Sequence, residues 1–242
     1  MKWFFHLGLA AVLSVLVCGA AKAGEKKDKQ EEGFASLFNG KDLSGWEGIA
    51  GAWEVRDGAI WCTGGKGNQW LIYRGGVYKD LELRLQFKYL GGNSGVQVRS
   101  AEFEPFQVRG YQAEIASQDK MGLWHHSKPP EKYRSRLSLA GQKVHIATDG
   151  KKTVEQVSPA EDVQVVYQYG QWNEMVITAR GDRLVHKING VVFSELIDEE
   201  TKYKMTSGII ALQDHGKGTQ VGFKDIRLRE IKRMDGTIKD MD

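Results

Sequence analysis

The sequence is short of residues that cross-link or interrupt a chain. Its 242 residues include two cysteines, Cys18 and Cys62, and four prolines. We expect Cys18 to leave with an N-terminal segment, so Cys62 has no intramolecular disulfide partner. We expect Cys62, which follows Trp61, to be a buried small hydrophobic residue rather than a nucleophile. Because the sequence has no proline- or serine-rich linker, we expect one folded domain whose stability depends on its hydrophobic core.

An excess of charge of either sign is also missing. The formal net charge is +3, and it falls to +1 when Lys2 and Lys22 are removed with the first 23 residues, which contain no acid. This balance gives no electrostatic case for nucleic-acid binding. With 41% hydrophobic and 27% charged residues, the composition is that of an ordinary globular protein.

The long hydrophobic run of the chain is at its N-terminus. Lys2 precedes an apolar run over residues 3–17, and small residues end at Ala23. A basic start, an apolar run and an A-x-A site predict a secretory signal peptide cleaved before Gly24. We therefore expect an exported protein, periplasmic or extracellular.

Two alternatives to cleavage before Gly24 remain open. Cys18 could carry a lipoprotein anchor, although the branched Val17 precedes it where small residues are usual. The run could also stay as an uncleaved anchor, since it is only a few residues short of a membrane span. No other stretch could span a membrane, and we expect no stable membrane partner.

The remaining sequence divides by composition. We expect a flexible charged lead-in over residues 24–33, one folded domain over 34–231, and a polar tail over 232–242. The 29 glycines are scattered at short intervals, which favours many short strands joined by turns.

Strand patterns run through the expected domain. Residues 81–89 alternate apolar and polar side chains, a period of two that no helix tolerates. Asp57-Gly58 and Asn189-Gly190 are typical of tight hairpin turns, and a turn also accounts for the Arg-Gly-Asp triplet at 180–182. We expect a short helix only over residues 198–205. About a dozen antiparallel strands predict an all-β jelly-roll sandwich of two sheets.

Two of these strands carry polar side chains on one face. Because strand side chains alternate, Asn93, Gln97 and Arg99 are expected to share a face, and so are Gln112 and Glu114. Amides, a guanidinium and a carboxylate on adjacent strands are typical of a groove that holds a sugar.

Several motifs in order resemble one family. They are FASLFNGKDLSGW at 34–46, DLELRLQFK at 80–88, NSGVQVR at 93–99, GYQAEI at 110–115, GIIALQDHG at 208–216 and VGFKDIRLRE at 221–230. Together they resemble the 3-keto-disaccharide hydrolase domain family, associated with 3-keto-glucoside-1,2-lyase and 3-keto-2-hydroxy-glucal hydratase activity and formerly called unknown-function domain 1080. The resemblance implies a concanavalin A-like lectin/glucanase sandwich and an oxidised (3-keto) glucoside or disaccharide as substrate. Family members often carry an acid where this chain has Gln112, whereas its own acid, Glu114, lies about 6 to 7 Å further along the strand.

The implied chemistry needs a base near C2 of the sugar, a positive charge or donor at the C3 oxygen, and an acid for the leaving group. We assign Glu114 as the base, Arg99 to the C3 oxygen, and His215 as the acid, with His125 and His126 as alternatives. Further substrate-binding side chains are expected to be those of Asn93, Gln97, Gln112, Gln213, Asp214, Trp70 and Trp124.

Each assignment has a structural alternative. Glu114 and Arg99 could form a salt bridge between strands. His215 could lie in a solvated loop, and Asp214 could cap a turn. No cofactor is expected, although Glu114, Asp119, His125 and His215 could converge on a divalent cation.

Two other functions remain open. The same sandwich could bind carbohydrate without catalysis, using tryptophans and amides but no base. A retaining β-glucanase would need two carboxylates about 5 to 5.5 Å apart, and only the Glu102 and Glu104 loop offers two acids two residues apart.

Overall fold

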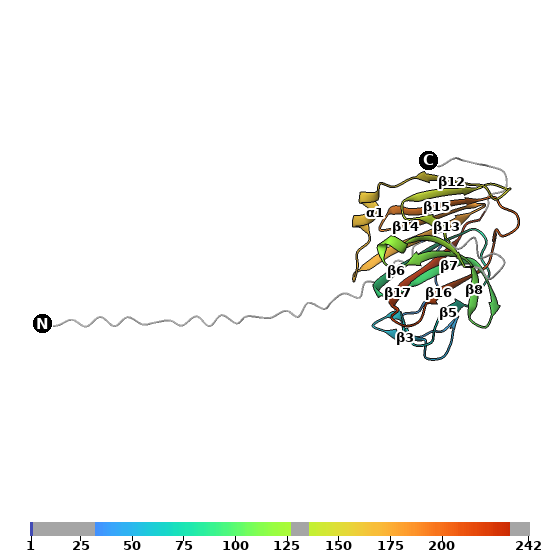
Figure 1. Ribbon diagram of the computed structural model, residues 1–242. Helices are drawn as coiled ribbons and strands as arrows, with labels where there is room; N and C mark the ends of the chain where they lie inside the picture. The colour runs from blue at the N-terminus through green and yellow to red at the C-terminus, as the bar shows by residue number, and fades with distance from the viewer. Residues whose placement is uncertain (2–31, 127–135, 233–242) are drawn as a thin grey trace. The chain divides into compact units, whose positions relative to one another are not determined.

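A computed structural model describes Met1 and residues 32–126 and 136–232 (Figure 1). Apart from Met1, the expected signal peptide lies outside the described residues, and so do nearly all of the lead-in and the polar tail. No helix within the described ranges is long and apolar enough to cross a bilayer.

Two sheets contain nearly all of the regular structure. The larger sheet has the order β12 (Lys152–Gln156), β11 (Gln142–Ile146), β15 (Val191–Asp198), β14 (Arg183–Ile188), β13 (Trp172–Arg180), β6 (Leu81–Gly91), β17 (Gln220–Glu230), β4 (Ala59–Cys62) and β3 (Trp53–Arg56), with β1 (Ala35–Ser36) beside β17. The smaller sheet has the order β10 (Arg136–Leu139), β9 (Gly122–His126), β8 (Gln107–Ile115), β7 (Ser94–Glu104), β16 (Ile209–Asp214), β5 (Gln69–Tyr73) and β2 (Trp46–Glu47). The predicted all-β sandwich is confirmed.

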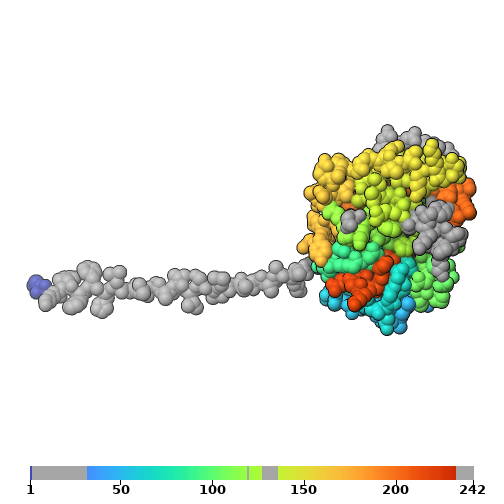
Figure 2. Space-filling view, viewed as in Figure 1, coloured from blue at the N-terminus to red at the C-terminus, as the bar shows by residue number. Residues whose placement is uncertain are grey.

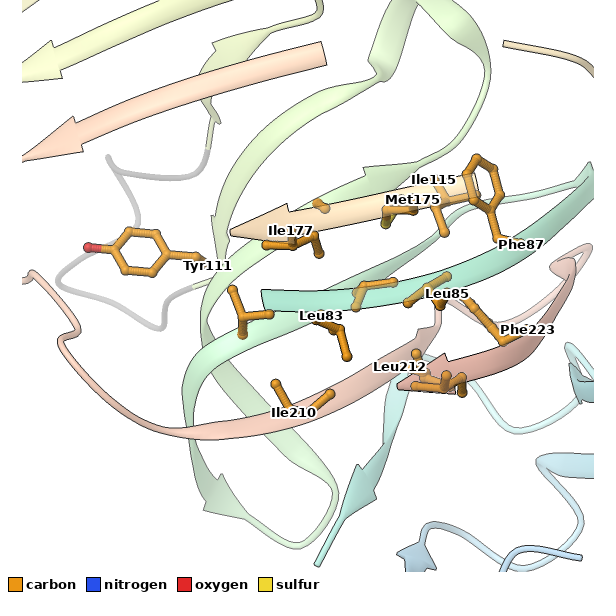
Figure 3. Packing of buried hydrophobic residues seen from close by; sticks show 14 of the residues in the cluster. Leu83, Leu85, Phe87, Tyr111, Ile115, Met175, Ile177, Ile210, Leu212 and Phe223 are labelled. Carbon is orange, nitrogen blue, oxygen red and sulfur yellow. The ribbon is translucent and has the colours of Figure 1, made fainter. Parts of the chain in front are cut away.

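The core lies between the two sheets. In Figure 3, Leu83, Leu85 and Phe87 of β6 pack with Ile210 and Leu212 of β16, and all five side chains are almost fully buried. The alternation predicted over residues 81–89 is therefore the inner face of a central strand. Burying such side chains is the main favourable term in folding.

The predicted hairpin turns are present. Asp57 and Asn189 have φ values of 51° and 47°, the left-handed conformation that a tight turn requires. These turns join β3 to β4 and β14 to β15. Gly181 and Asp182 form the turn between β13 and β14, so a hairpin explains the Arg-Gly-Asp triplet.

The predicted helix at 198–205 is wrong. Strand β15 continues to Asp198, whose carboxylate accepts a hydrogen bond from the Tyr111 hydroxyl, and the same hydroxyl accepts from the Met205 backbone N–H. This tertiary contact holds both ends of the segment in a turn. The described residues form a helix instead at α1 (Ala160–Val166), where only Val163 is buried and the apolar periodicity is weak.

One edge of the larger sheet is open to solvent. All five residues of β12 are exposed, and in the part of the chain that the structure describes β12 pairs only with β11. Residues around 150, β12 among them, form the yellow surface near the top of the space-filling view (Figure 2).

At the other end of the sheet Cys62 of β4 is buried, as predicted, and its thiol faces the Gln213 carbonyl at 3.5 Å.

Candidate functional site

A buried polar cluster lies on the side of the smaller sheet that faces away from the core. Its members, which we call the polar face, are Gln97 of β7, Gln112 and Glu114 of β8, and Gln213 of β16. Gln97 pairs in register with Gln112, and Gly95 lies between Glu114 and Gln213. Three strands thus bring these four side chains together. For β7 and β8, the alternation of side chains along the sequence predicted this shared face.

The amides of the polar face form a continuous hydrogen-bond network. Gln97 Nε2 donates to Gln112 Oε1 at 3.0 Å, and Gln112 Nε2 donates to both Glu114 Oε2 and Gln213 Oε1 at 2.8 Å. At the two ends, Ser100 Oγ donates to Gln97 Oε1 at 2.5 Å, and Gln213 Nε2 donates to Asn68 Oδ1 at 2.9 Å. These bonds satisfy amides that would otherwise be costly to bury.

Glu114 is the acidic group of this network. Its side chain accepts from Asn93 Nδ2 on one oxygen and from Gln112 on the other, and the residue is 3% exposed. Burial raises the pKa of Glu114 to about 7, while these two hydrogen bonds and the charges of Arg136 and Lys120 oppose that rise. Glu114 can therefore exchange a proton near neutral pH.

Gly95 leaves the room that this arrangement needs. A Cβ atom at Gly95 would lie 2.5 Å from the side-chain Cδ of Gln112, too close for any real contact. The missing side chain lets Gln112 lie across the strand between Glu114 and Gln213.

Arg99 does not lie on the polar face, contrary to the prediction. Between Val98, which pairs with Tyr111, and Ala101, which pairs with Arg109, β7 holds one more residue than β8. Arg99, at φ 47°, is part of this β-bulge, which reverses the alternation of side chains.

The Arg99 guanidinium contacts groups outside the polar face. It donates to the carbonyls of Lys79 and Gly181 at 2.6 and 2.7 Å and pairs with Asp80 Oδ1 at 2.8 Å. The alternative of a Glu114–Arg99 salt bridge is therefore also wrong. Glu114 forms no salt bridge with any of the basic residues in the described ranges.

Trp70 is buried inside the site and is not an open sugar platform. It lies in strand β5 rather than in a loop and is 2% exposed. Its indole N–H donates to Gln112 Oε1 at 3.4 Å, and its ring meets the His126 ring edge-on, with centroids 5.2 Å apart. Since β5 and β9 are four positions apart in the sheet, the sheet must bend for the rings to meet.

Trp124 and Arg136 form an accessible pair beside this cluster. Trp124 pairs in register with Gln112 and Arg136, and it is half-buried. The exposed Arg136 lies over the Trp124 ring, with 4.9 Å between the guanidinium carbon and the ring centroid. An exposed arginine and an aromatic ring next to buried amides are suited to a sugar.

The three candidate histidines lie on different faces of the smaller sheet. His126 is on the side of Trp70, and burial, with a smaller effect of the nearby His215, lowers its pKa to about 4. His215 is exposed, and its backbone N–H donates to the Asn93 carbonyl at 3.3 Å, which places it beside the residue that contacts Glu114. His125 instead packs on Tyr111 on the core side, with ring centroids 5.3 Å apart.

Asp214 does not face a substrate. Its two carboxylate oxygens accept from the backbone N–H groups of Gly216 and Gly64, at 2.9 and 3.1 Å. The residue is fully buried and holds the turn after β16. The alternative that it caps a turn is confirmed.

The four residues considered for a divalent cation do not form one site. Glu114 and His125 lie on opposite faces of the smaller sheet. Within residues 32–126 and 136–232, no three His, Cys, Asp or Glu side chains gather closely enough to hold a metal. The side chain of Asp119 is outside what the structure describes.

Three contributors were not among the predicted site residues. Ser100 joins the network because the bulge turns it onto the polar face, and a bulge has no marker in the sequence of one strand. Asn68 lies in the loop before β5 and Arg136 at the start of β10. Both come from segments that only the sheet order brings close to Gln112.

The fold has counterparts among solved structures. The chain is similar to a protein from Parabacteroides distasonis described as a candidate glycosyl hydrolase, with 21% identity, a TM-score of 0.56, and coverage of 83% of this chain and 95% of that one. It is also similar to carbohydrate-binding module CBM66 from Bacillus subtilis, with 13% identity, a TM-score of 0.50, and coverage of 78% and 98%.

A Bacillus subtilis protein with a galectin-like fold gives 10% identity, a TM-score of 0.53, and coverage of 81% and 94%. These likenesses show the predicted lectin-type jelly-roll sandwich. No curated protein matches the sequence.

The family model described as 3-keto-alpha-glucoside-1,2-lyase-like domain matches residues 33–229, which include every element of the polar face. The chain therefore belongs to the 3-keto-alpha-glucoside-1,2-lyase-like domain family.

Proposed function

We propose that this protein is an exported carbohydrate-active enzyme that cleaves 3-keto-glycosides, with Glu114 as the general base. One observation carries the proposal. Glu114 is a buried carboxyl group held by two amide donors, and its pKa of about 7 suits proton abstraction at neutral pH. The family and the carbohydrate-binding relatives of the fold support a sugar ligand.

The proposed reaction begins with proton transfer from C2 of the sugar to Glu114. The ketone at C3 makes this proton acidic, because the electron pair of the C2–H bond becomes part of an enolate. The enolate then reforms the C3 carbonyl, a C1–C2 double bond forms, and the C1–oxygen bond breaks with its electron pair on the leaving group. A proton completes the released alcohol, and water added across the double bond would give net hydrolysis.

The described residues offer a group for each remaining step. Arg136, whose charge already acts on Glu114, takes the place at the enolate that was predicted for Arg99. His215, exposed beside Asn93, remains our proposal for the proton donor to the leaving group. Trp124 would contact the apolar face of the ring.

Turnover and proton exchange test the proposal. The purified protein is incubated with 3-keto-disaccharides and with the parent sugars, with and without chelator, and deuterium incorporation at C2 is followed in D₂O. We expect cleavage and exchange only with the keto-sugars. Glu114→Gln should lower both by about 10² to 10⁴-fold, the usual contribution of a general base.

Glu102→Gln is the matched control. Glu102 is a carboxylate of the same sheet that pairs with Arg74 at 2.6 Å, so its loss should leave turnover unchanged. Unchanged turnover in Glu114→Gln would remove Glu114 from the mechanism. Loss of activity on adding chelator would show that a metal takes part in the reaction.

Binding without catalysis is the second candidate function, favoured by the likeness of the fold to a carbohydrate-binding module. It predicts measurable affinity for the sugars, no turnover of either class, and no effect of Glu114→Gln beyond binding. The glucanase alternative is weaker, since the four residues of the polar face include one carboxyl group, whereas a retaining enzyme needs two about 5 to 5.5 Å apart.

A further inference from the structure

The amide of Gln112 uses its whole hydrogen-bonding capacity. Its oxygen accepts from Gln97 Nε2 at 3.0 Å and from Trp70 Nε1 at 3.4 Å, while its nitrogen donates to Glu114 and Gln213, each at 2.8 Å. A glutamine amide has two donors and two acceptor positions, so no position is left over.

Which end of this amide faces Glu114 is decided by its other neighbours. The indole N–H of Trp70 can only donate, so the end of Gln112 beside it must be the oxygen. Gln97 Nε2 contacts the same oxygen at 3.0 Å and adds a second donor there. The NH₂ end of Gln112 is thereby turned to Glu114.

We propose that Trp70 and Gln97 are positioning residues that lock the Gln112 amide with its NH₂ group toward Glu114, so that the carboxylate is ready to accept a proton. Turned the other way, the Gln112 carbonyl would face a Glu114 oxygen, and two acceptors tolerate that contact only when a proton lies between them. The catalytic consequence rests on the proposed function of Glu114, whereas the lock itself does not. Trp70, predicted as a sugar platform, would act instead through Gln112.

The other groups around Glu114 come from every neighbouring element. Asn93 donates to its second oxygen, Lys120 and Arg136 act on it by charge, and His126 and His215 lie on the same side of the sheet. The Gln112 oxygen takes its hydrogen bonds from Trp70 and Gln97 instead. A variant at Gln97 therefore changes the lock alone, whereas a variant at Trp70 also changes the ring that meets His126.

The lock is tested by titrating Glu114 directly. Carbon-13 NMR of protein labelled at glutamate carboxyls, assigned with Glu114→Gln, gives the titration midpoint in the wild type, Trp70→Phe and Gln97→Met. Each variant removes one donor to Gln112 and keeps most of the side-chain volume. We expect the midpoint to rise by about one pH unit, the lower end of the effect of a hydrogen bond to a charged group.

In the pH profile of kcat/KM, the acid limb should move to higher pH by the same amount. The maximal value at high pH should be retained. Ile72→Val is the packing control, since Ile72 lies in the same strand and the same apolar cluster as Trp70. Its midpoint should equal that of the wild type.

An unchanged midpoint in both Trp70→Phe and Gln97→Met would overturn the lock, and so would an equal rise in Ile72→Val. Should Trp70→Phe fail to fold, Gln97→Met decides alone. Shifted midpoints without turnover of any keto-sugar would support the lock and refute the proposed function. Turnover of keto-sugars with unshifted midpoints would support the proposed function and refute the lock.

Discussion

The Arg99 side chain points away from the polar face, although its strand, β7, contributes Gln97 to that face. Its guanidinium satisfies two backbone carbonyls and the Asp80 carboxylate, and both side chains of the ion pair are about 95% buried, at 4% and 5% exposed. The backbone of Arg99 is in the left-handed region, which costs free energy that these contacts offset. The residue therefore holds the end of the sandwich together and does not meet a substrate.

Replacing Arg99 should affect stability and not substrate binding. We expect Arg99→Met to lower the free energy of unfolding by about 3 kcal/mol, because the buried Asp80 carboxylate would lose the positive charge paired with it. Urea denaturation measures this change. Arg136→Met is the comparison, since Arg136 is exposed and should change stability little but reduce turnover. A stable Arg99→Met protein with weakened substrate binding would contradict our assignment.

At the scale of the element, the bulge in β7 decides what the polar face contains. It turns Arg99 away and brings Ser100 to Gln97, and its partner residue across the ladder is Gly110, at φ 145°. A Cβ atom on Gly110 would meet Ser100 Oγ and lie 2.7 Å from the Ser100 Cα atom. The bulge and this glycine therefore fit each other.

Gly110→Ala should disturb the hairpin of β7 and β8. We expect a loss of about 2 kcal/mol or more in unfolding free energy, because the new methyl group collides with backbone as well as side chain. Gly170→Ala is the matched control, since Gly170 also has a positive φ, of 71°, but nothing within 4 Å of its added Cβ. Equal losses in the two variants would mean that backbone strain alone, and not the fit to Ser100, is responsible.

At the scale of the whole molecule, two buried titratable groups give stability opposite pH dependences. His186 is fully buried in the core, and burial lowers its pKa from 6.5 to about 3. Its contribution is present above pH 6.5 and is lost as the pH falls toward 3. Burial raises the pKa of Glu114 from 4.5 to about 7, so its contribution is present below pH 4.5 and lost as the pH rises toward 7.

Between pH 4.5 and 6.5 the slope from Glu114 opposes the slope from His186, and below pH 4.5 it no longer does. We therefore expect Glu114→Gln to lose stability already from pH 6.5 downward, whereas His186→Leu should resist acid better than the wild type. The differences are on the order of 3 kcal/mol for Glu114 and 5 kcal/mol for His186. Urea midpoints measured from pH 3 to 8 check both, and parallel curves for all three proteins would refute the assignment.

The sequence allowed much of the sandwich to be predicted, because alternation in strands such as β6 and turn pairs such as Asn189-Gly190 are local signals. It placed Gln97, Gln112 and Glu114 together for the same reason. The position of Arg99 could not be predicted, since a bulge depends on the partner strand. The burial of Trp70 and the turn at Met205 could not be predicted either, because both follow from contacts between segments that are distant in the sequence.

Strand β12 has a consequence for handling the protein. It is the terminal strand of the larger sheet among the described residues, all five of its residues are exposed, and Val154 at its centre is 56% exposed. Such an edge can extend a sheet from one copy to the next, which at high concentration leads to aggregation. Val154→Lys should therefore raise the concentration at which the protein stays in solution, and light scattering of concentrated samples would show whether it does.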